Sequence, residues 1–441
     1  MTRSRWLFLL LALLGALALT AAGCGGDDEE EGGATGTGAA EPSGEGGASG
    51  EIAIMGVWTG AEQQAFQAVI DGFNEQNPDV TVNYTAAGDQ LPTQISTAVE
   101  GGNPPDVATL PQPGLMRDLV ARDALIPLDF AAEDIETNLG ESAVELGTVD
   151  GTLYGFIFKA ANKSTVWYNV QAFEDAGVEP AATYEELIEA GNTIQQSGLP
   201  AYSIGGADGW TLTDLFENIY LRQAGPETYD QLAEHEIKWT DQSVKDALTT
   251  MGEILSQKDN MVGNPLQTDF PTSVSNVFAA NPKAAMVIEG DFVPGSVESN
   301  LEAETGYNVF EFPSVDGSEQ MIVGGGDTIV AFKDNPATQA FVKYLTTSEA
   351  AEIWAQRGGF ASLNKDLDPS VYPDAIQQET SGALAETDIF RFDLSDLQPS
   401  EFGGTVGQGL FKLFQDFLAD PDDVDGIAKQ MEQAAAEAYG K

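Results

Sequence analysis

Short runs of β-prone residues alternate with amphipathic helical patterns at the start of the folded part of the chain. The β-prone runs cover Glu51–Val57, Val80–Thr85 and Asp106–Leu110, and apolar residues recur at helical spacing between them. This β-α-β-α-β order predicts parallel strands joined by right-handed crossovers, and therefore an α/β fold. Ligands of such sheets bind beyond the carboxyl ends of the strands. The residues that follow the three strands, and that we expect near a ligand, include Trp58, Asp89 and Gln112.

Local signals mark several later elements. Thr183 and Glu186 form a capping box, in which each side chain satisfies an orphan backbone donor at the start of a helix. The run Gly324–Phe332 indicates a flexible glycine joint that enters a strand, and roughly the last hundred residues are mostly helical. The other predicted elements are a hairpin at Val149–Thr152, strands at Ser164–Tyr168, Ala285–Glu289 and Tyr307–Phe312, and helices at Leu212–Ala224 and Gln242–Gln257.

Charge and motif content argue against a nucleic-acid partner and against catalysis. Acidic residues outnumber basic ones 70 to 19, which gives a formal charge of -51 and a surface that repels phosphates. The single histidine, His235, lacks a second histidine at zinc-helix spacing, and its polar surroundings predict a surface position. The chain has no nucleophile elbow and no phosphate-binding glycine-lysine loop. We therefore expect no enzyme activity, no cofactor and no metal.

Two chemical alternatives stay open at this level. A glycosidase needs only two carboxylates, and this chain has many. The stretch Pro421–Glu432 has the glycine and the final glutamate of a calcium loop, but Pro421 stands at the first ligand position. An aspartate-rich helix start explains that stretch equally well.

The N-terminus has the order of a secretion signal, with basic residues, an apolar run and small residues in succession. Arg3 and Arg5 precede the run Trp6–Leu19, whose length of about 14 residues is shorter than the ~20 residues of a membrane-spanning helix. The string LTAAGCG resembles a bacterial lipobox. We expect residues 1–23 to be a cleaved signal peptide and Cys24 to carry a lipid; a secreted protein with a free thiol and an uncleaved anchor are the alternatives. Since Cys24 is the single cysteine, no disulfide forms within the chain.

A low-complexity segment separates the cysteine from the folded body. Gly25–Gly50 contains only Gly, Ala, Ser, Thr, Pro, Asp and Glu. Such a composition cannot bury enough apolar surface to order itself, so residues 24–50 are expected to form a lipidated, disordered acidic tether. As a flexible coil the tether would span about 28 Å between its ends. It would hold the body near the membrane and still let it tumble.

Aromatic residues and carboxylates occur together at several glycine-rich turns. Saccharides present hydroxyls that hydrogen-bond to carboxylates and amides, and C–H patches that stack on aromatic faces. The mixtures in this chain are Trp58 with Glu62, Asp208 with Trp210, Asp291 with Phe292, and Phe392 with Asp393 and Asp396. Their repetition favours a saccharide-binding site.

Longer stretches resemble the carbohydrate-binding subunits of bacterial ABC importers, extracellular solute-binding protein family 1. The resemblance rests on Val149–Gly225, which includes KSTVWYN, and on AAMVIEGDFVPG, QRGGFASLN and FRFDLSDLQP. It implies the type II periplasmic-binding-protein fold, in which two α/β lobes joined by a hinge close over a sugar, as in maltose-binding proteins. On this pattern the N-lobe comprises residues 51–163 plus 326–365, and the C-lobe comprises residues 164–325 plus 366–441.

The resemblance also implies positions for the ligand contacts, in the loops after the first strands and in the cleft between the lobes. Where maltose-binding relatives have a tryptophan in the late C-terminal helix, this chain has Phe411 or Phe414, which weakens any inference to maltose or long maltodextrins. The predicted ligand-binding residues are Trp58, Glu62, Asp89, Gln112, Lys163, Asp208, Trp210, Asp291, Phe292, Asp327 and Asp393.

These observations predict a monomeric, extracytoplasmic sugar-binding subunit of an ABC importer. It would capture a mono- or oligosaccharide between its lobes and deliver it to the transmembrane permease subunits. The lipid on Cys24 would place it on the outer face of the cytoplasmic membrane. A protein of the same fold that binds another solute, such as a polyamine, is the main alternative, and a secreted glycosidase or a structural lipoprotein has less support.

Overall fold

The computed structural model describes residues 48–297 and 301–440 of the protein, apart from the side chains of residues 142, 385 and 386. The predicted signal peptide, Cys24 and the tether up to residue 47 lie outside the described residues. Within the described ranges, no helix is both long enough and apolar enough to span a membrane.

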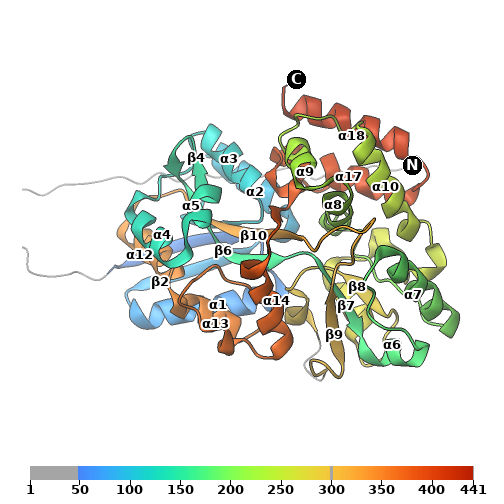
Figure 1. The fold of residues 1–441 in the computed structure, drawn as a ribbon. Coiled ribbons are helices and arrows are strands. Elements are labelled where there is room, and N and C mark those ends of the chain that lie inside the picture. Colours follow the sequence, from blue (N-terminus) through green and yellow to red (C-terminus); the bar gives the residue numbers. More distant parts are fainter. Residues whose placement is uncertain (1–47, 298–300, 441) are drawn as a thin grey trace, which may run out of the picture. The chain divides into compact units, whose positions relative to one another are not determined.

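A six-stranded sheet forms the centre of one half of the described body (Figure 1). β1 (Gly50–Gly56) pairs in parallel with β2 (Val80–Ala86) and with β3 (Val107–Leu110). The helices α1 (Gly60–Gln76) and α2 (Leu91–Glu100) connect these strands. The predicted β-α-β-α-β order is therefore confirmed.

The strand β10 (Ile322–Ala331) occupies an inner position in this sheet. It pairs antiparallel with β3 and with β6 (Gly155–Asn162), and parallel with β11 (Phe390–Phe392). The predicted strand within Gly324–Phe332 is confirmed, but the predicted flexible joint is wrong, because the three glycines are paired with β6 inside the strand. Lack of space explains the glycines: a Cβ atom on Gly326 would lie 2.6 Å from a side-chain atom of β6 and 3.0 Å from a carbonyl oxygen of the same strand.

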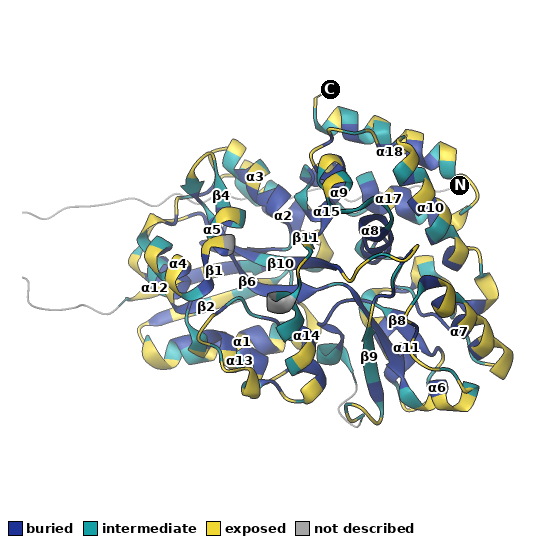
Figure 2. Ribbon diagram, viewed as in Figure 1, coloured by how far each residue is buried: buried dark blue, intermediate teal, exposed yellow. Residues whose placement is uncertain are grey.

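A three-stranded antiparallel sheet forms the centre of the other half of the body. β7 (Thr165–Asn169) lies between β8 (Met286–Ile288) and β9 (Tyr307–Glu311). The helix α8 (Trp210–Ala224) is buried on nearly all sides (Figure 2), so it lies in the interior of this half and does not cover its surface.

Local sequence signals predicted several of the remaining elements correctly. Thr183 accepts a hydrogen bond from the backbone N–H of Glu186, whose carboxylate accepts one from the backbone N–H of Thr183, so the predicted capping box starts α7 (Tyr184–Ser197). The predicted hairpin is formed by β4 (Thr148–Val149) and β5 (Thr152–Leu153). The other helices are α3 (Pro113–Ala121), α4 (Ala132–Leu139), α5 (Glu141–Gly147), α6 (Val170–Ala176), α9 (Pro226–Ala233), α10 (Gln242–Leu255), α11 (Phe270–Phe278), α12 (Pro336–Leu345), α13 (Ser348–Ala355), α14 (Ala375–Glu386), α15 (Leu394–Leu397), α16 (Ser400–Gly403), α17 (Gly409–Ala419) and α18 (Val424–Ala438), with short 3-10 turns that include η1 (Gly88–Gln90) and η5 (Val293–Ser296).

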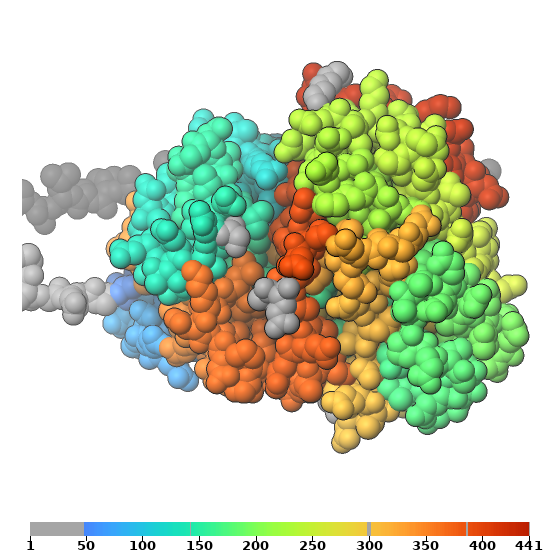
Figure 3. Space-filling model, in the orientation of Figure 1, coloured from blue at the N-terminus to red at the C-terminus, as the bar shows by residue number. Residues whose placement is uncertain are grey.

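Each half has its own large hydrophobic core. One core contains Phe66, Phe158 and Trp354, and the other contains Phe216 and Trp239. The chain passes between the halves where β6 is followed by β7, where β9 leads to β10, and where β11 leads to α15. Figure 3 shows the orange-red stretch that leads into β11 at the boundary between the two halves on this face. The described body therefore has two lobes joined by crossing segments.

The position of His235 differs from the prediction. This residue is only 7 % exposed, its Nε2 lies 3.3 Å from Oε2 of Glu432, and its ring centre lies 5.0 Å from that of Tyr439. Glu432 belongs to α18 and Tyr439 follows it. His235 is buried because α18 packs over the turn that follows α9, a long-range contact that the polar local sequence does not reveal.

The aspartates near the C-terminus begin a helix. Asp423 accepts a hydrogen bond from the backbone N–H of Gly426 at 3.1 Å and so caps α18. The described residues contain no group of three or more histidines, cysteines or carboxylates arranged to hold a metal ion.

Candidate functional site

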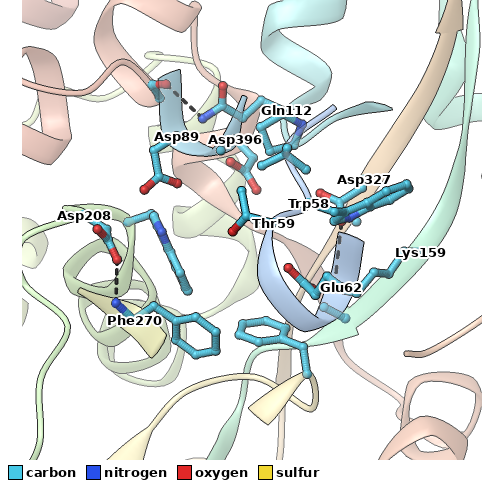
Figure 4. A pocket seen from close by; sticks show the side chains of 18 of the residues that line it. Trp58, Thr59, Glu62, Asp89, Gln112, Lys159, Asp208, Phe270, Asp327 and Asp396 are labelled. Atoms are coloured by element: carbon cyan, nitrogen blue, oxygen red, sulfur yellow. Dashed lines mark hydrogen bonds and ion pairs between the residues drawn. The ribbon is translucent and has the colours of Figure 1, made fainter. Parts of the chain in front are cut away.

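A cavity of about 280 Å³ opens at the carboxyl ends of β1, β2 and β3. The first lobe lines it with the loop Val57–Glu62, with Asp89 in η1, and with parts of β6 and β10. The second lobe lines it with Asp208 and Trp210, with the start of α11 and with the loop around Phe292. Figure 4 shows side chains of both lobes directed into this space. A molecule in the cavity would therefore contact both lobes.

A buried ionic network forms one wall of the cavity. Trp58 donates a hydrogen bond from Nε1 to Oδ2 of Asp327 at 2.6 Å, and Lys159 Nζ lies 3.1 Å from Oε1 of Glu62 and 3.9 Å from Oδ2 of Asp327. Burial lowers the pKa of Lys159, but the two carboxylates outweigh burial and raise it above its usual value. Lys159 is therefore charged at neutral pH. Trp58 is 1 % exposed and packs 4.7 Å from the ring of Trp354, so it mainly holds Asp327 in place.

A second lysine, in the crossing segment after β6, forms ion pairs with carboxylates of the second lobe. Lys163 Nζ lies 3.1 Å from Oδ1 of Asp214, 2.5 Å from Oδ2 of Asp393 and 3.6 Å from Oδ2 of Asp396. Burial acts to raise the pKa of Asp393, but the charge and hydrogen bond of Lys163 outweigh it and lower that pKa below its usual value. Removing either partner of such a buried pair would leave an uncompensated charge.

Three aromatic rings form the wall contributed by the second lobe. The ring centres of Trp210, Phe270 and Phe292 lie 5.3 to 5.9 Å apart. Gly209 starts α8 with a φ of 90°, and a Cβ atom there would lie 2.6 Å from Cβ of Phe411, so this turn requires glycine. The close turn sets Trp210 at the cavity. The three rings offer the apolar faces that a saccharide stacks on.

Two carboxylates occupy the other end of the cavity. Asp208 accepts a hydrogen bond from the backbone N–H of Phe270 at 2.6 Å, and Asp89 lies across from it in the first lobe (Figure 4). Burial, and then the charge of Asp89, raises the pKa of Asp208 to about 7. Burial, and then the charges of Asp269 and Glu62, raises the pKa of Asp89 to about 6.

The structure brings the predicted ligand-binding residues together, with two exceptions. Asp291 is 3 % exposed and Asp393 is fully buried, and neither lines the cavity. Asp393 binds Lys163, while burial raises the pKa of Asp291 to about 7. Gln112 lines the cavity and donates from Nε2 to the carbonyl oxygen of Gly404 at 3.2 Å. The remaining residues that line it as expected are Trp58, Glu62, Asp89, Lys163, Asp208, Trp210, Phe292 and Asp327.

The predicted ligand-binding set left out several residues that line the cavity, among them Lys159, Asp396 and Phe270. Lys159 stands alone as a charge in the apolar run of β6, and a lysine in a buried strand is a signal that could have identified it. Asp396, which was grouped with Phe392 and Asp393 in the sequence but left out of the predicted set, lines the cavity and lies 3.6 Å from Lys163 Nζ. Phe270 is placed by the fold of α11 and has no local signal. Of the two phenylalanines suggested in place of a late tryptophan, Phe411 lines the cavity, and Phe414 lies in the core.

Comparison with known proteins agrees with this geometry. A family model described as bacterial extracellular solute-binding protein matches residues 49–352. The osmoprotective compounds-binding protein GgtB of Synechocystis is 31% identical over 371 residues, which cover 82% of this chain and 86% of GgtB. The alpha-glucosides-binding periplasmic protein AglE of Rhizobium meliloti is 33% identical over 378 residues, which cover 82% of this chain and 81% of AglE.

A solved structure of similar fold is that of the bacterial solute receptor AcbH, which prefers β-D-galactopyranose. It superposes with a TM-score of 0.79 at 20% identity, over 88% of this chain and 98% of the receptor. At this identity the similarity concerns the fold, and it confirms the predicted arrangement of two α/β lobes.

Proposed function

This chain belongs to the family of bacterial extracellular solute-binding proteins and has the two-lobed type II periplasmic-binding-protein fold, and on that premise we propose that it captures a small saccharide for an ABC importer. The observation that carries the proposal is the cavity between the lobes, in which three aromatic rings face a set of carboxylates. A saccharide combines C–H faces with hydroxyl donors, and the two kinds of wall match these two kinds of surface.

The size of the cavity favours a mono- or disaccharide. Its volume of about 280 Å³ is at the lower limit of the ~300–1,000 Å³ that small-molecule sites usually have. Because AglE is named for binding alpha-glucosides, α-linked disaccharides of glucose are the first ligands to test.

Capture would couple to closure of the lobes. A ligand shifts an equilibrium between open and closed forms only through its higher affinity for one of them. A saccharide that contacts Trp210 in one lobe and Glu62 in the other gains contacts only when both walls are close. We propose that the lobe built on the six-stranded sheet, which includes β11, moves against the lobe built on β7, β8 and β9, and that the closed form delivers the sugar to the permease.

Anchoring is part of the same proposal. A lipid on Cys24, after removal of residues 1–23, would hold the monomeric protein on the outer face of the cytoplasmic membrane. Cys24→Ser tests this directly: the variant should be recovered from the medium or the periplasm, and the unchanged protein from the membrane fraction. A variant that stays in the membrane fraction would contradict lipid anchoring.

A thermal-shift screen of the full chain tests the binding function. Trehalose, sucrose, maltose, glucose and galactose are compared, and a sugar at 100 times its dissociation constant should add about 2.7 kcal/mol of stability. Calorimetry then measures the affinity of each positive sugar, and the full chain should leave these sugars unhydrolysed. No shift with any saccharide would contradict the proposal, and hydrolysis would favour a glycosidase.

A polyamine is the second candidate ligand, because Asp89 and Asp208 have no cationic partner among the described residues. Spermidine belongs in the same screen. A shift with spermidine and a flat response to every sugar would favour this alternative.

A further inference from the structure

The two ends of the cavity differ in charge balance. At one end Lys159 lies 3.1 Å from Glu62 and 3.9 Å from Asp327, so the carboxylates there have a cationic partner. The other lysine in the lining, Lys163, is held by the carboxylates of the second lobe. Asp89 and Asp208 form no ion pair in the described part of the chain, and we call their side of the cavity the acidic end.

The charged groups that act on the acidic end are all carboxylates. Asp269, the N-cap of α11, acts on both Asp89 and Asp208, and Glu62 on α1 acts on Asp89. Glu289, which follows β8, is 2 % exposed; burial, and then the charge of Asp214, raises its pKa, Lys163 acts to lower it, and Asp208 adds a smaller effect. The two lysines that line the cavity, Lys159 and Lys163, come from the β6 segment and are paired with carboxylates other than Asp89 and Asp208.

The two carboxylates belong to opposite lobes. Asp89 lies in η1 after β2, and Asp208 lies in the loop before α8 (Figure 4). Asp89 is an exposed residue, but its carboxylate is directed into the cavity. Closure of the lobes over a ligand would remove water from both groups and hold like charges near one another. Each carboxylate therefore binds a proton more tightly when the lobes are closed.

We propose that Asp89 and Asp208 make the site charge-selective: a neutral saccharide binds together with one proton, and a saccharide that carries a phosphate or a carboxylate is excluded. This inference rests on the proposed binding of a saccharide. The proton lets one of the two carboxyl groups donate a hydrogen bond, so it can face the other group or a sugar oxygen without repulsion. An anionic sugar would instead bring a further negative charge to an end of the cavity that lacks a cation among the described residues.

The expected pH dependence follows from the two carboxyl groups as a coupled pair. In this structure the pKa is about 7 for Asp208 and about 6 for Asp89; with these values in the closed form of our proposal, and ordinary values near 3.8 when the lobes are apart, affinity should rise as pH falls from 8.5 to 6.5. The rise is roughly fivefold, because the closed form is mostly singly protonated at the lower pH and unprotonated at the higher pH. Lowering the pH below about 4 should give no further gain, because both forms are then protonated.

Calorimetry on the full chain measures the coupling between sugar binding and proton uptake. The neutral probe is the best binder among trehalose, sucrose and maltose, and the anionic probe is the 6-phosphate of the same disaccharide. Titrations at pH 6.5 in buffers of different ionisation enthalpy should show uptake of about one proton per sugar, and at pH 8.5 uptake close to zero. The 6-phosphate should bind at least tenfold more weakly than the neutral sugar.

Matched variants test whether Asp89 and Asp208 are the groups that take up the proton when the sugar binds. Asp89→Asn and Asp208→Asn keep the shape of each side chain and remove one charge, and each should reduce the proton uptake and flatten the pH dependence. The control is Asp79→Asn, which removes the same charge at an exposed residue outside the cavity. It should keep the wild-type proton uptake. If one of the cavity variants no longer binds the sugar, the other variant and the wild-type titrations still show whether proton uptake accompanies sugar binding.

The outcomes separate this inference from the proposed function. If no mono- or disaccharide of the screen binds at either pH, the proposed function fails. If a neutral disaccharide binds with the same affinity at pH 6.5 and 8.5 and without proton uptake, or if the 6-phosphate binds equally well, the charge-selective end is refuted and the binding function stands. Tighter binding of spermidine than of any disaccharide would also overturn the inference, since the acidic end would then hold a cation in place of a proton.

Discussion

Asp291 should make the protein less stable as pH rises, and replacing it with asparagine should remove that dependence. The residue is 3 % exposed, and neither of its carboxylate oxygens has a hydrogen bond of good geometry within the described residues. Burial raises its pKa from 3.8 to about 7, although the nearby charge of Lys159 acts in the opposite direction. The folded state therefore holds this proton more tightly than the unfolded state does.

The sign and the size of the effect follow from linkage. Because the pKa is higher in the folded state, stability is lost as pH rises from about 4 to about 7, and the full loss is present above that range. Between pH 5.5 and pH 8 this group alone should lower the free energy of unfolding by about 2 kcal/mol. The amide of the Asp291→Asn variant does not titrate, so the difference between wild type and variant isolates the contribution of this carboxyl group.

Urea unfolding at pH 5.5, 7 and 8 measures the difference. Wild-type stability minus variant stability should fall by about 2 kcal/mol across the range. For the exposed control Asp79→Asn, the corresponding difference should vary by less than about 0.5 kcal/mol. Since Asp291 does not line the cavity, Asp291→Asn should also keep the wild-type sugar affinity. A wild-type-minus-variant difference that is the same at every pH would refute the reasoning, because Asp291 would then ionise as it does in the unfolded chain.

Three further substitutions test other parts of the account. Trp210→Ala should weaken saccharide binding about 10- to 100-fold in calorimetry, because it removes the largest ring of the aromatic wall, and Trp210→Phe should lose less; equal affinities would remove this ring from the site. Trp58→Phe should lower the free energy of unfolding by about 1–3 kcal/mol, because Asp327 loses the donor at 2.6 Å; an unchanged urea midpoint would contradict the role assigned to Trp58. Gly326→Ala should cost about 1–3 kcal/mol, because its Cβ atom would crowd β6, whereas Gly382→Ala on the open face of α14 should be neutral or stabilising; equal effects would argue against close packing at β10.

The first lobe was predictable because its elements are local. The strands β1, β2 and β3 and the helices between them each have a clear period, and their order alone predicts parallel pairing. Loops after such strands converge on one edge of a sheet, so the sequence alone places Trp58, Asp89 and Gln112 near a ligand. The second-lobe residues Asp208 and Trp210 were indicated by their aromatic-carboxylate composition, but only the family resemblance placed them opposite the first-lobe loops.

The errors concern residues whose surroundings are built by distant parts of the chain. Glycines in sequence predict flexibility, but those of β10 are required because β6 packs against them. The local sequence around His235 is polar, but α18 covers it from almost two hundred residues away. Asp291 and its neighbour Phe292 were both expected at the ligand, and only Phe292 lines the cavity. Which of two adjacent side chains faces a cavity depends on the backbone conformation of the loop, which composition does not specify.

A crystal structure of the full chain with the tightest-binding disaccharide tests the central claim most directly. The account predicts density for the sugar in the cavity, with its rings against Trp210, Phe270 and Phe292 and its hydroxyls within hydrogen-bonding distance of carboxylates from both lobes. A sugar bound on the outer surface of one lobe, with only solvent between Asp89 and Trp210, would contradict it.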